Sequence, residues 1–120
     1  MGKRTLVLGA SENTERYSNM AIKSLRLHGN EVMAIGKKEG IVDDVKIATE
    51  KKSLDNIDTV SIYLNPQNQK EYEAYILSLK PKRIIFNPGA ENRSFAEKAS
   101  AEGVMPIEAC TLVLLATGQY

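Results

Sequence analysis

Small and polar residues follow the first apolar run of the chain, in a pattern that suits the binding of a phosphate group. The run 5–8 (TLVL) leads into Gly9, Ala10 and Ser11, and a polar stretch continues to Arg16. A glycine at a strand end permits a tight turn, and a serine hydroxyl can donate to a phosphate oxygen. The second and third glycines of the G-x-G-x-x-G dinucleotide fingerprint are missing. The pattern therefore fits a nucleotide site and, equally, an ordinary turn between a strand and a helix.

Two lysines after the second apolar run narrow the choice of ligand. NAD-binding domains usually place an acidic residue here, because its carboxylate accepts hydrogen bonds from the ribose hydroxyls. This chain has Gly36, Lys37 and Lys38 instead. Ammonium groups favour a phosphate on the adenosine ribose, which is the 3′-phosphate of coenzyme A or the 2′-phosphate of NADP. The alternative is that both lysines are simply solvated at the surface.

Two later apolar runs end in residues that expose the backbone. Asn-Pro follows one run at 65–66, and Asn-Pro-Gly follows the other at 87–89. Proline and glycine end a strand sharply, so their first role is structural. A second role would be to border an adenine ring and the arm attached to it. Asn92 and Ser94 precede the next expected helix, where either can be an N-cap or a ligand contact.

Few side chains near this expected site could take part in a reaction. Beyond Tyr17 the main candidate is Cys110, which is the only cysteine, and His28 is the only histidine. We expect His28 at the far end of the first helix, so a Cys–His pair is not predicted and Cys110 is better explained as a structural thiol. The acidic residues show no metal-ligand spacing. A binding module is therefore favoured over the alternative, an NADP-linked or Cys110-dependent enzyme.

Short apolar runs alternate with amphipathic stretches along the chain, which is the pattern of βαβ units. It predicts an α/β fold, a Rossmann-like three-layer domain with a five-stranded, mainly parallel sheet in the order 3-2-1-4-5. That order puts the topological switch point, where ligands enter open sheets, between the first and fourth strands. The strands are expected at 5–8, 31–35, 59–64, 83–86 and 104–107, and the helices at 18–28, 67–79 and 94–102.

The stretch 37–57 is less regular than the rest. Val45 and Ile47 alternate with polar neighbours, so a short strand fits there, and a brief helical turn is expected at 53–57. No linker, repeat or low-complexity tract interrupts the chain. We therefore expect one domain over residues 1–120.

Composition and charge limit the classes of function. A chain of 120 residues with 42% hydrophobic and 26% charged residues can bury one ordinary core. Its formal net charge of +1 argues against broad electrostatic binding to nucleic acid or to an anionic membrane. One cysteine cannot form an intrachain disulfide. Neither a signal-peptide core nor a membrane-spanning run is visible, so we expect a cytoplasmic monomer or homodimer with a small-molecule nucleotide partner.

The strand ends together resemble a known family, the small stand-alone CoA-binding proteins, which are similar to the CoA-binding domain of succinyl-CoA synthetase α subunits. The matching pieces are VLGAS at 7–11, NP at 65–66, NPGAEN at 87–92 and EAC at 108–110. The resemblance covers nearly the whole chain. It implies a non-catalytic module that binds coenzyme A or an acyl-CoA at the carboxyl ends of the parallel strands.

The resemblance also implies which residues contact the ligand. The first loop would lie on the CoA phosphates, the end of the second strand on the ribose phosphate, the segment after the third strand on the adenine, and the segment at 88–89 along the pantetheine arm. The contacts that the resemblance implies are Gly9, Ala10, Ser11, Lys37, Lys38, Asn65, Pro66, Gln69, Pro88, Gly89 and Asn92. Tyr17, Gly36 and Cys110 complete the expected site.

Two departures from the family pattern bear on this expectation. The family commonly has Asn-Pro at the end of the second strand, where this chain has Gly36 and Lys37. The loop after Ser11 contains Glu12 and Glu15, which would repel phosphate unless they point outward. These departures leave a third alternative, a protein-interaction subunit that has lost ligand binding.

Overall fold

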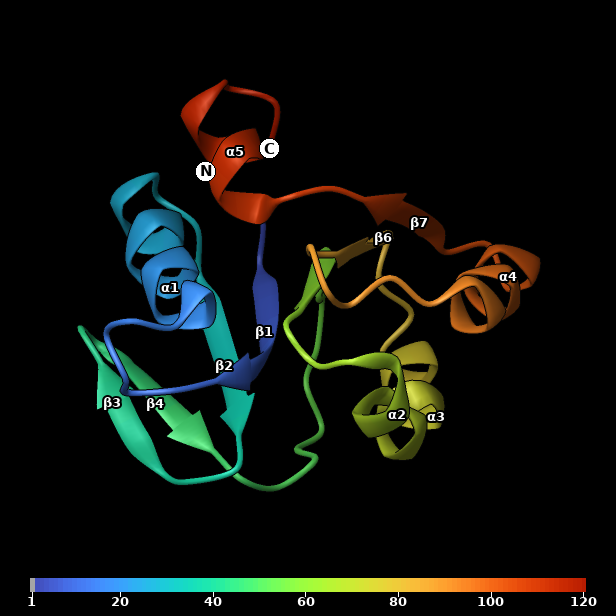
Figure 1. Cartoon of the computed structure of the whole chain (residues 1–120), viewed down its shortest axis with the longest axis horizontal. Coiled ribbons are helices and arrows are strands. Elements are labelled where there is room, and N and C mark those ends of the chain that lie inside the picture. Colours follow the sequence, from blue (N-terminus) through green and yellow to red (C-terminus); the bar gives the residue numbers. More distant parts are fainter. Residues whose placement is uncertain (1) are drawn as a thin grey trace.

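The computed structural model describes residues 2–120. Its strands are β1 (Thr5–Ala10), β2 (Val32–Gly36), β3 (Gly40–Val42), β4 (Val45–Ala48), β5 (Thr59–Ile62), β6 (Arg83–Phe86) and β7 (Met105–Glu108). The helices are α1 (Tyr17–Leu27), α2 (Pro66–Gln69), α3 (Glu73–Ser78), α4 (Arg93–Ala101) and α5 (Thr111–Ala116), with a 3-10 turn η1 (Lys70–Tyr72) between α2 and α3. All strands belong to one sheet in the order β3-β4-β2-β1-β5-β6-β7 (Figure 1). Only the pairing of β3 with β4 is antiparallel.

The Rossmann-like α/β class with a mostly parallel sheet is confirmed, but the predicted number and order of strands are wrong. The order 3-2-1-4-5 would place the strand at 59–64 beyond the second strand. Instead β5 lies beside β1, with Thr5 opposite Thr59, and β4 and β3 occupy the far side of β2. The topological switch point consequently lies between β1 and β5.

The outer strands explain this difference. Val45 and Ile47 are buried while Lys46 between them is exposed, so the short strand suggested by their alternation is present as β4. β4 pairs with β2 and occupies the position that the prediction gave to the strand at 59–64. β3 returns against β4 through a tight hairpin in which Asp43 adopts a φ of 53°.

The predicted helical turn at 53–57 is also wrong. The segment from Thr49 to Asp58 contains neither a helix nor a strand and reaches the start of β5 through bends at 49, 50 and 55. Asn56 has a φ of 56°, a left-handed conformation that does not continue a right-handed turn. Ile57 is buried in the core, and the Asp58 N–H donates to the Arg4 carbonyl at 2.8 Å. This segment therefore carries the chain from one side of β1 to the other without a crossover helix.

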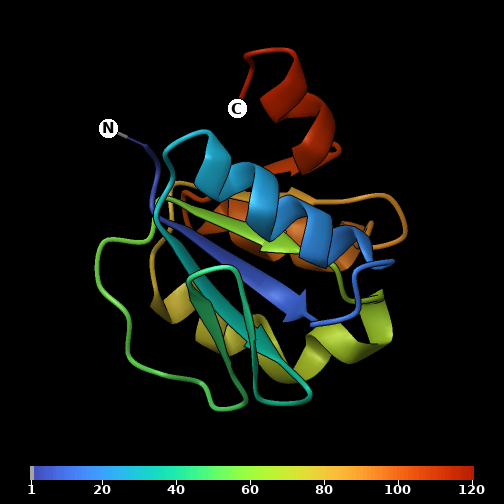
Figure 2. The ribbon, with the colours of Figure 1, turned by 90° about the vertical axis from the view of Figure 1, so that its left-hand side faces the viewer.

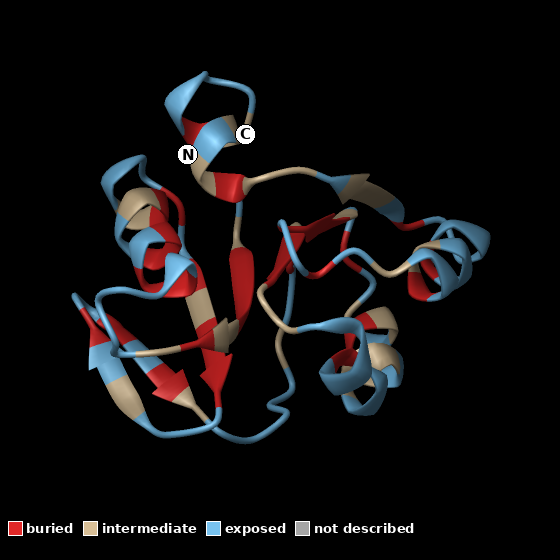
Figure 3. Cartoon of the chain, in the orientation of Figure 1, coloured by how far each residue is buried: buried red, intermediate tan, exposed pale blue. Residues whose placement is uncertain are grey.

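Helices cover both faces of the sheet (Figure 2). On one face, α1 and α5 pack with buried strand residues such as Val7 and Ala34. On the other face, α3 and α4 pack through Ile76 and Phe95 on strand residues that include Leu8. Buried residues are concentrated on the central strands, as expected for a parallel sheet covered on both sides (Figure 3). Within residues 2–120, no helix has the length and apolar character needed to cross a membrane.

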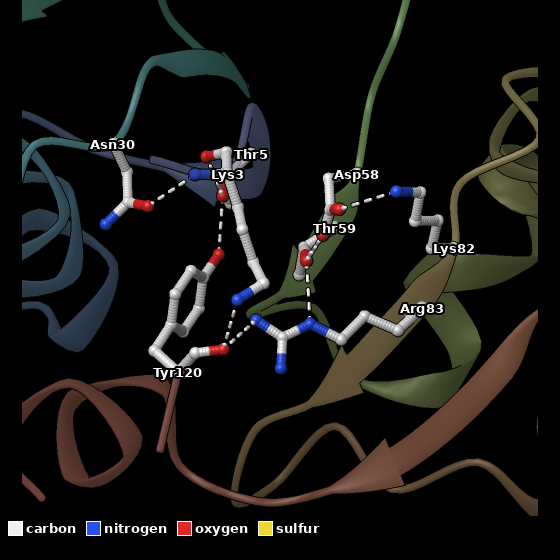
Figure 4. Close-up of polar contacts among 8 residues, drawn as sticks. All are labelled: Lys3, Thr5, Asn30, Asp58, Thr59, Lys82, Arg83 and Tyr120. Atoms are coloured by element: carbon white, nitrogen blue, oxygen red, sulfur yellow. Dashed lines mark hydrogen bonds and ion pairs between the residues drawn. The ribbon is translucent and has the colours of Figure 1, made fainter. Parts of the chain in front are cut away.

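The amino ends of the central strands are closed by the end of the chain (Figure 4). The Tyr120 main-chain oxygen accepts hydrogen bonds from Lys3 Nζ and Arg83 Nη2, both at 2.9 Å. The Arg83 guanidinium lies 4.4 Å from the centre of the Tyr120 ring, and the Tyr120 hydroxyl is hydrogen-bonded to Thr5. Burial raises the pKa of the Tyr120 phenol. Protein groups thus occupy this edge of the sheet.

The close contact of β1 and β2 gives a testable prediction. A Cβ on Gly36 would overlap the Ala10 carbonyl oxygen, whereas a Cβ on Gly29 would meet nothing within 4 Å. We expect Gly36→Ala to lower the free energy of unfolding by about 3 kcal/mol or more, because strand backbone must move. Gly29→Ala is the control and should cost only about 1 kcal/mol, from its φ of +81°. Equal losses in urea denaturation would contradict the proposed backbone contact.

Candidate functional site

The loop after β1 passes directly over the end of β5. Gly9 has a φ of +92°, and a Cβ there would lie 3.2 Å from the main-chain carbon and oxygen of Tyr63. The Tyr63 N–H donates to the Leu8 carbonyl at 2.9 Å. Glycine is therefore required at this turn both by the backbone conformation and by the close approach. The contact sets the loop at the switch point between β1 and β5.

The same loop offers hydrogen-bond donors. Ser11 Oγ accepts from the Asn13 N–H at 3.0 Å, which leaves the hydroxyl proton free to donate to another group. Asn19, which is 2% exposed, donates from Nδ2 to the Ser11 carbonyl at 3.0 Å and holds the loop against α1. Among residues 2–120, the N–H groups of Glu12 and Thr14 have no protein acceptor. Such a set of donors suits an anion.

Glu12 is turned away from these donors. Its Oε2 accepts from the Ile41 N–H at 2.8 Å, at the start of β3. Its side chain also fills the space beside Gly40, where a Cβ would overlap it. Glu12 therefore joins the loops after β1 and β2. Because its carboxylate points to β3, it would repel a phosphate at the loop after β1 less than expected. Glu15 is exposed, and its N–H donates to Asn13 Oδ1 at 2.9 Å.

Lys37 and Lys38 follow β2 at the same edge of the sheet. Both are exposed, and neither forms an ion pair with any of residues 2–120. Gly36 before them is buried against Ala10, which lets the end of β2 lie close to the loop after β1. Tyr17, the first residue of α1, is 68% exposed. The two ammonium groups are therefore free to bind a phosphate.

Gln69 joins the loops after β5 and β6. It is fully buried, and its Nε2 donates to the Leu64 carbonyl at 2.8 Å and to the Ala90 carbonyl at 2.7 Å. Its Oε1 accepts from Asn92 Nδ2 at 2.9 Å. Because these contacts use the side-chain amide, the geometry gives Gln69 a role in positioning the loops. A direct ligand contact by its side chain would require these bonds to break.

Asn65 and Asn92 are helix caps. Asn65 Oδ1 accepts from the Asn68 N–H at 2.9 Å, and Asn92 Oδ1 accepts from the Phe95 N–H at 3.1 Å. The structure thus selects Asn92 over Ser94 as the cap of α4. Pro66 and Asn92 face an open pocket of about 620 Å³ between α2–α3 and α4, whose other lining residues are Gln67, Lys70, Glu73, Ser94 and Lys98.

Pro88, Gly89 and Cys110 complete the predicted set. Pro88 and Gly89 are exposed after β6, and Gly89 has a φ of +94°. Cys110 is half-buried and directly precedes α5.

His28 lies at the carboxyl end of α1, where its Nδ1 contacts the Ser24 carbonyl at 2.8 Å. The structure therefore provides no Cys–His pair. Within residues 2–120 there is also no acidic, histidine or cysteine cluster that could hold a metal ion.

Sequence reasoning missed a buried polar network beside Cys110. Asn87 Nδ2 donates to Ser61 Oγ and to the Ile62 carbonyl, both at 2.9 Å, and Asn87 Oδ1 accepts from the Thr111 N–H at 2.8 Å. The hydroxyls of Ser61 and Thr111 are 2.8 Å apart. The signal for Ser61 was a hydroxyl inside the otherwise apolar strand around it. From the sequence, Asn87 has a role as a strand terminator or as part of a border of the ligand, and neither role includes this network.

Tyr63 lies next to this network. Its hydroxyl is buried and has no hydrogen-bond partner among the described residues. Burial raises the pKa of Tyr63 to about 12. The phenol therefore stays protonated at neutral pH and cannot act as a general base there.

Parallel strands bring the fourteen predicted residues to one edge of the sheet. They follow β1, β2, β5, β6 and β7, whose carboxyl ends are neighbours in the sheet. Hydrogen bonds or close contacts link each of these loops to the next. Gln69 and the two strand residues Ala10 and Gly36 are buried, while the others are at least partly accessible. The edge combines an amide-rich loop, free ammonium groups and two exposed prolines.

Comparison with known proteins gives a consistent result. A family model described as "CoA binding domain" matches residues 3–116. An uncharacterised protein of known crystal structure is 46% identical, covers 100% of this chain and 99% of its own, and superposes with a TM-score of 0.97. A hypothetical protein from Pyrococcus horikoshii OT3 is 25% identical over 93% of this chain and 80% of its own, with a TM-score of 0.84.

A more distant likeness concerns the fold alone. A dinucleotide-forming acetyl-coenzyme A synthetase from Candidatus Korarchaeum cryptofilum, solved with phosphate and ADP, is 14% identical over 90% of this chain and 26% of its own, with a TM-score of 0.71. No curated protein sequence matches the chain. The family match extends over nearly the whole sequence, and on that ground the chain belongs to the CoA binding domain family.

Proposed function

We propose that the chain, as one cytoplasmic domain over residues 1–120, binds coenzyme A or an acyl-CoA at the carboxyl edge of its sheet and carries out no reaction itself. The observation that carries this proposal is an amide-rich loop at the switch point with two free ammonium groups after the neighbouring strand β2. The family match supports the ligand class. An anionic nucleotide with a further phosphate on its ribose is complementary to both features.

Each part of the ligand has a counterpart among the residues present. The Ser11 hydroxyl and the free N–H groups of the loop after β1 would hold the diphosphate. Lys37 and Lys38 would hold the 3′-phosphate. The pantetheine arm would pass the exposed surface of Pro66 and Pro88–Gly89 toward the half-buried Cys110.

The enzyme alternative finds less support in the geometry. Cys110 directly precedes α5, whereas His28 lies at the carboxyl end of α1, so the two do not form a pair. Burial raises the pKa of Tyr63, beside the Ser61–Thr111 network, to about 12, so its phenol holds its proton at neutral pH. NADP stays a ligand to be tested, because its 2′-phosphate would also suit the two lysines.

The ligand can be identified from thermal stability. At 100 times its dissociation constant, a ligand adds about 2.7 kcal/mol to the free energy of unfolding, which for a domain of this size is a rise in Tm of about 10 °C. We expect this rise with CoA and a clearly smaller one with dephospho-CoA, because only CoA carries the 3′-phosphate. NAD is the negative control, and NADP tests the alternative. No rise with CoA at millimolar concentration would contradict the proposed function.

The role of the lysine pair can be tested separately. We expect Lys37→Ala/Lys38→Ala to weaken CoA binding about tenfold or more in isothermal titration, because two charge-assisted contacts to the 3′-phosphate are lost. The affinity for dephospho-CoA should stay within about twofold. Lys80→Ala/Lys82→Ala removes the same charge at the opposite edge and serves as the control. Equal weakening by both double variants would show a general charge effect, and the specific role of Lys37 and Lys38 would be refuted.

A further inference from the structure

The start of α5 is held mainly by polar contacts. α5 is only six residues long, and within it Thr111 and Leu115 alone are buried, while Val113 is 55% exposed. Such a short helix has little apolar area with which to fix its position. The hydrogen bonds of Thr111 to Asn87 and Ser61 anchor the first residue of α5 on the sheet, while Leu115 packs in the core.

The residues of this anchor are more deeply buried than polar side chains usually are. Ser61 and Thr111 are fully buried, and Asn87 is 1% exposed. Every polar atom of the Asn87 amide has a partner: Nδ2 donates twice and Oδ1 accepts once. A buried amide that is fully satisfied fixes one arrangement, because any shift leaves a buried polar group without a partner.

The anchor connects the two segments that border the far end of the proposed CoA site. Asn87 directly precedes Pro88–Gly89, and Thr111 directly follows Cys110. The Asn87–Thr111 bond spans 2.8 Å, so the two segments are held at a fixed separation. The Ala109 N–H also donates to the Phe86 carbonyl, at 3.2 Å, and adds a main-chain bond between the same two segments.

We propose that Asn87, Ser61 and Thr111 are positioning residues for the pantetheine end of the ligand. They set the exposed backbone at 88–89 and the segment around Cys110 as one wall of the site, and they do not touch the nucleotide end. This inference rests on the proposed function. It predicts that damage to the network lowers the affinity for the pantetheine arm and leaves the affinity for the nucleotide part unchanged.

The test compares two ligands on matched variants. Thr111→Val breaks the hydroxyl bond to Ser61, leaves the main-chain bond to Asn87 in place and keeps the shape of the side chain. Thr117→Val makes the same change at the other end of α5, where the described partners of the hydroxyl are Val113, Leu114 and Gln119. Isothermal titration measures CoA and adenosine 3′,5′-bisphosphate, which lacks the pantetheine arm. We expect Thr111→Val to bind CoA about five- to tenfold more weakly, with bisphosphate binding within about twofold. Thr117→Val should change neither.

Other outcomes overturn the proposal. Unchanged CoA affinity in Thr111→Val, or an equal loss for both ligands, would reduce the network to a general structural role. Ser61→Ala is the second variant if Thr111→Val does not fold, with the same expectation. A wild-type chain that binds neither ligand would contradict the proposed function, and the positioning role with it. The rate at which Ellman's reagent modifies Cys110 is a second readout; it should rise severalfold in Thr111→Val and stay constant in Thr117→Val.

Discussion

The parallel pairing of β2, β1, β5, β6 and β7 is the constraint on which the rest of the molecule depends. Parallel strands all end at one edge, so loops that are far apart in the sequence become neighbours there. Two glycines make the edge compact. Gly9 lets the loop after β1 touch the main chain at Tyr63, and Gly36 lets β2 end against Ala10. Larger residues at these positions would separate the loops that form the site.

Polar side chains then fasten each loop to its neighbour. Glu12 bonds the loop after β1 to the start of β3, Gln69 bonds the loop after β5 to that after β6, and Asn87 bonds the end of β6 to the start of α5. The loops do not depend on a ligand for these contacts. A site organised in advance requires less ordering when a ligand binds, which favours affinity. The opposite edge has a different role, because Tyr120 and Arg83 fill it with protein contacts (Figure 4).

The sequence predicted the class of the fold and most of its elements because those depend on local patterns. Apolar runs, N-caps such as Asn92 and terminators such as Gly89 act within a few residues. The order of the strands depends on which of two distant strands, β4 or β5, pairs with the free edge of β2, and local patterns do not decide this. The weak alternation of Val45 and Ile47 was enough for a strand, and that strand took the place beside β2. Asn56 adopts a left-handed conformation, which prevents a helical turn and which asparagine tolerates better than most residues.

The contrast between local patterns and long-range contacts applies to the site as well. Glycines, lysines and prolines that follow strands were visible as candidates because position along the chain is sufficient to place them. The bonding partners of Gln69, Glu12 and Asn87 lie between 21 and 29 residues away, so only the folded chain reveals them. Residues that were predicted as ligand contacts, such as Gln69 and Asn65, have structural bonds that a sequence pattern does not show.

Amide chemical shifts recorded during a titration with CoA give the most direct test of where the ligand binds. If the carboxyl edge is the site, the shifts will be largest for residues 10–18, 36–40, 63–67, 87–92 and 109–111, and those around Lys3, Thr59 and Tyr120 will not move. Shifts centred on the Tyr120 edge, or no shifts at saturating CoA, would contradict the account.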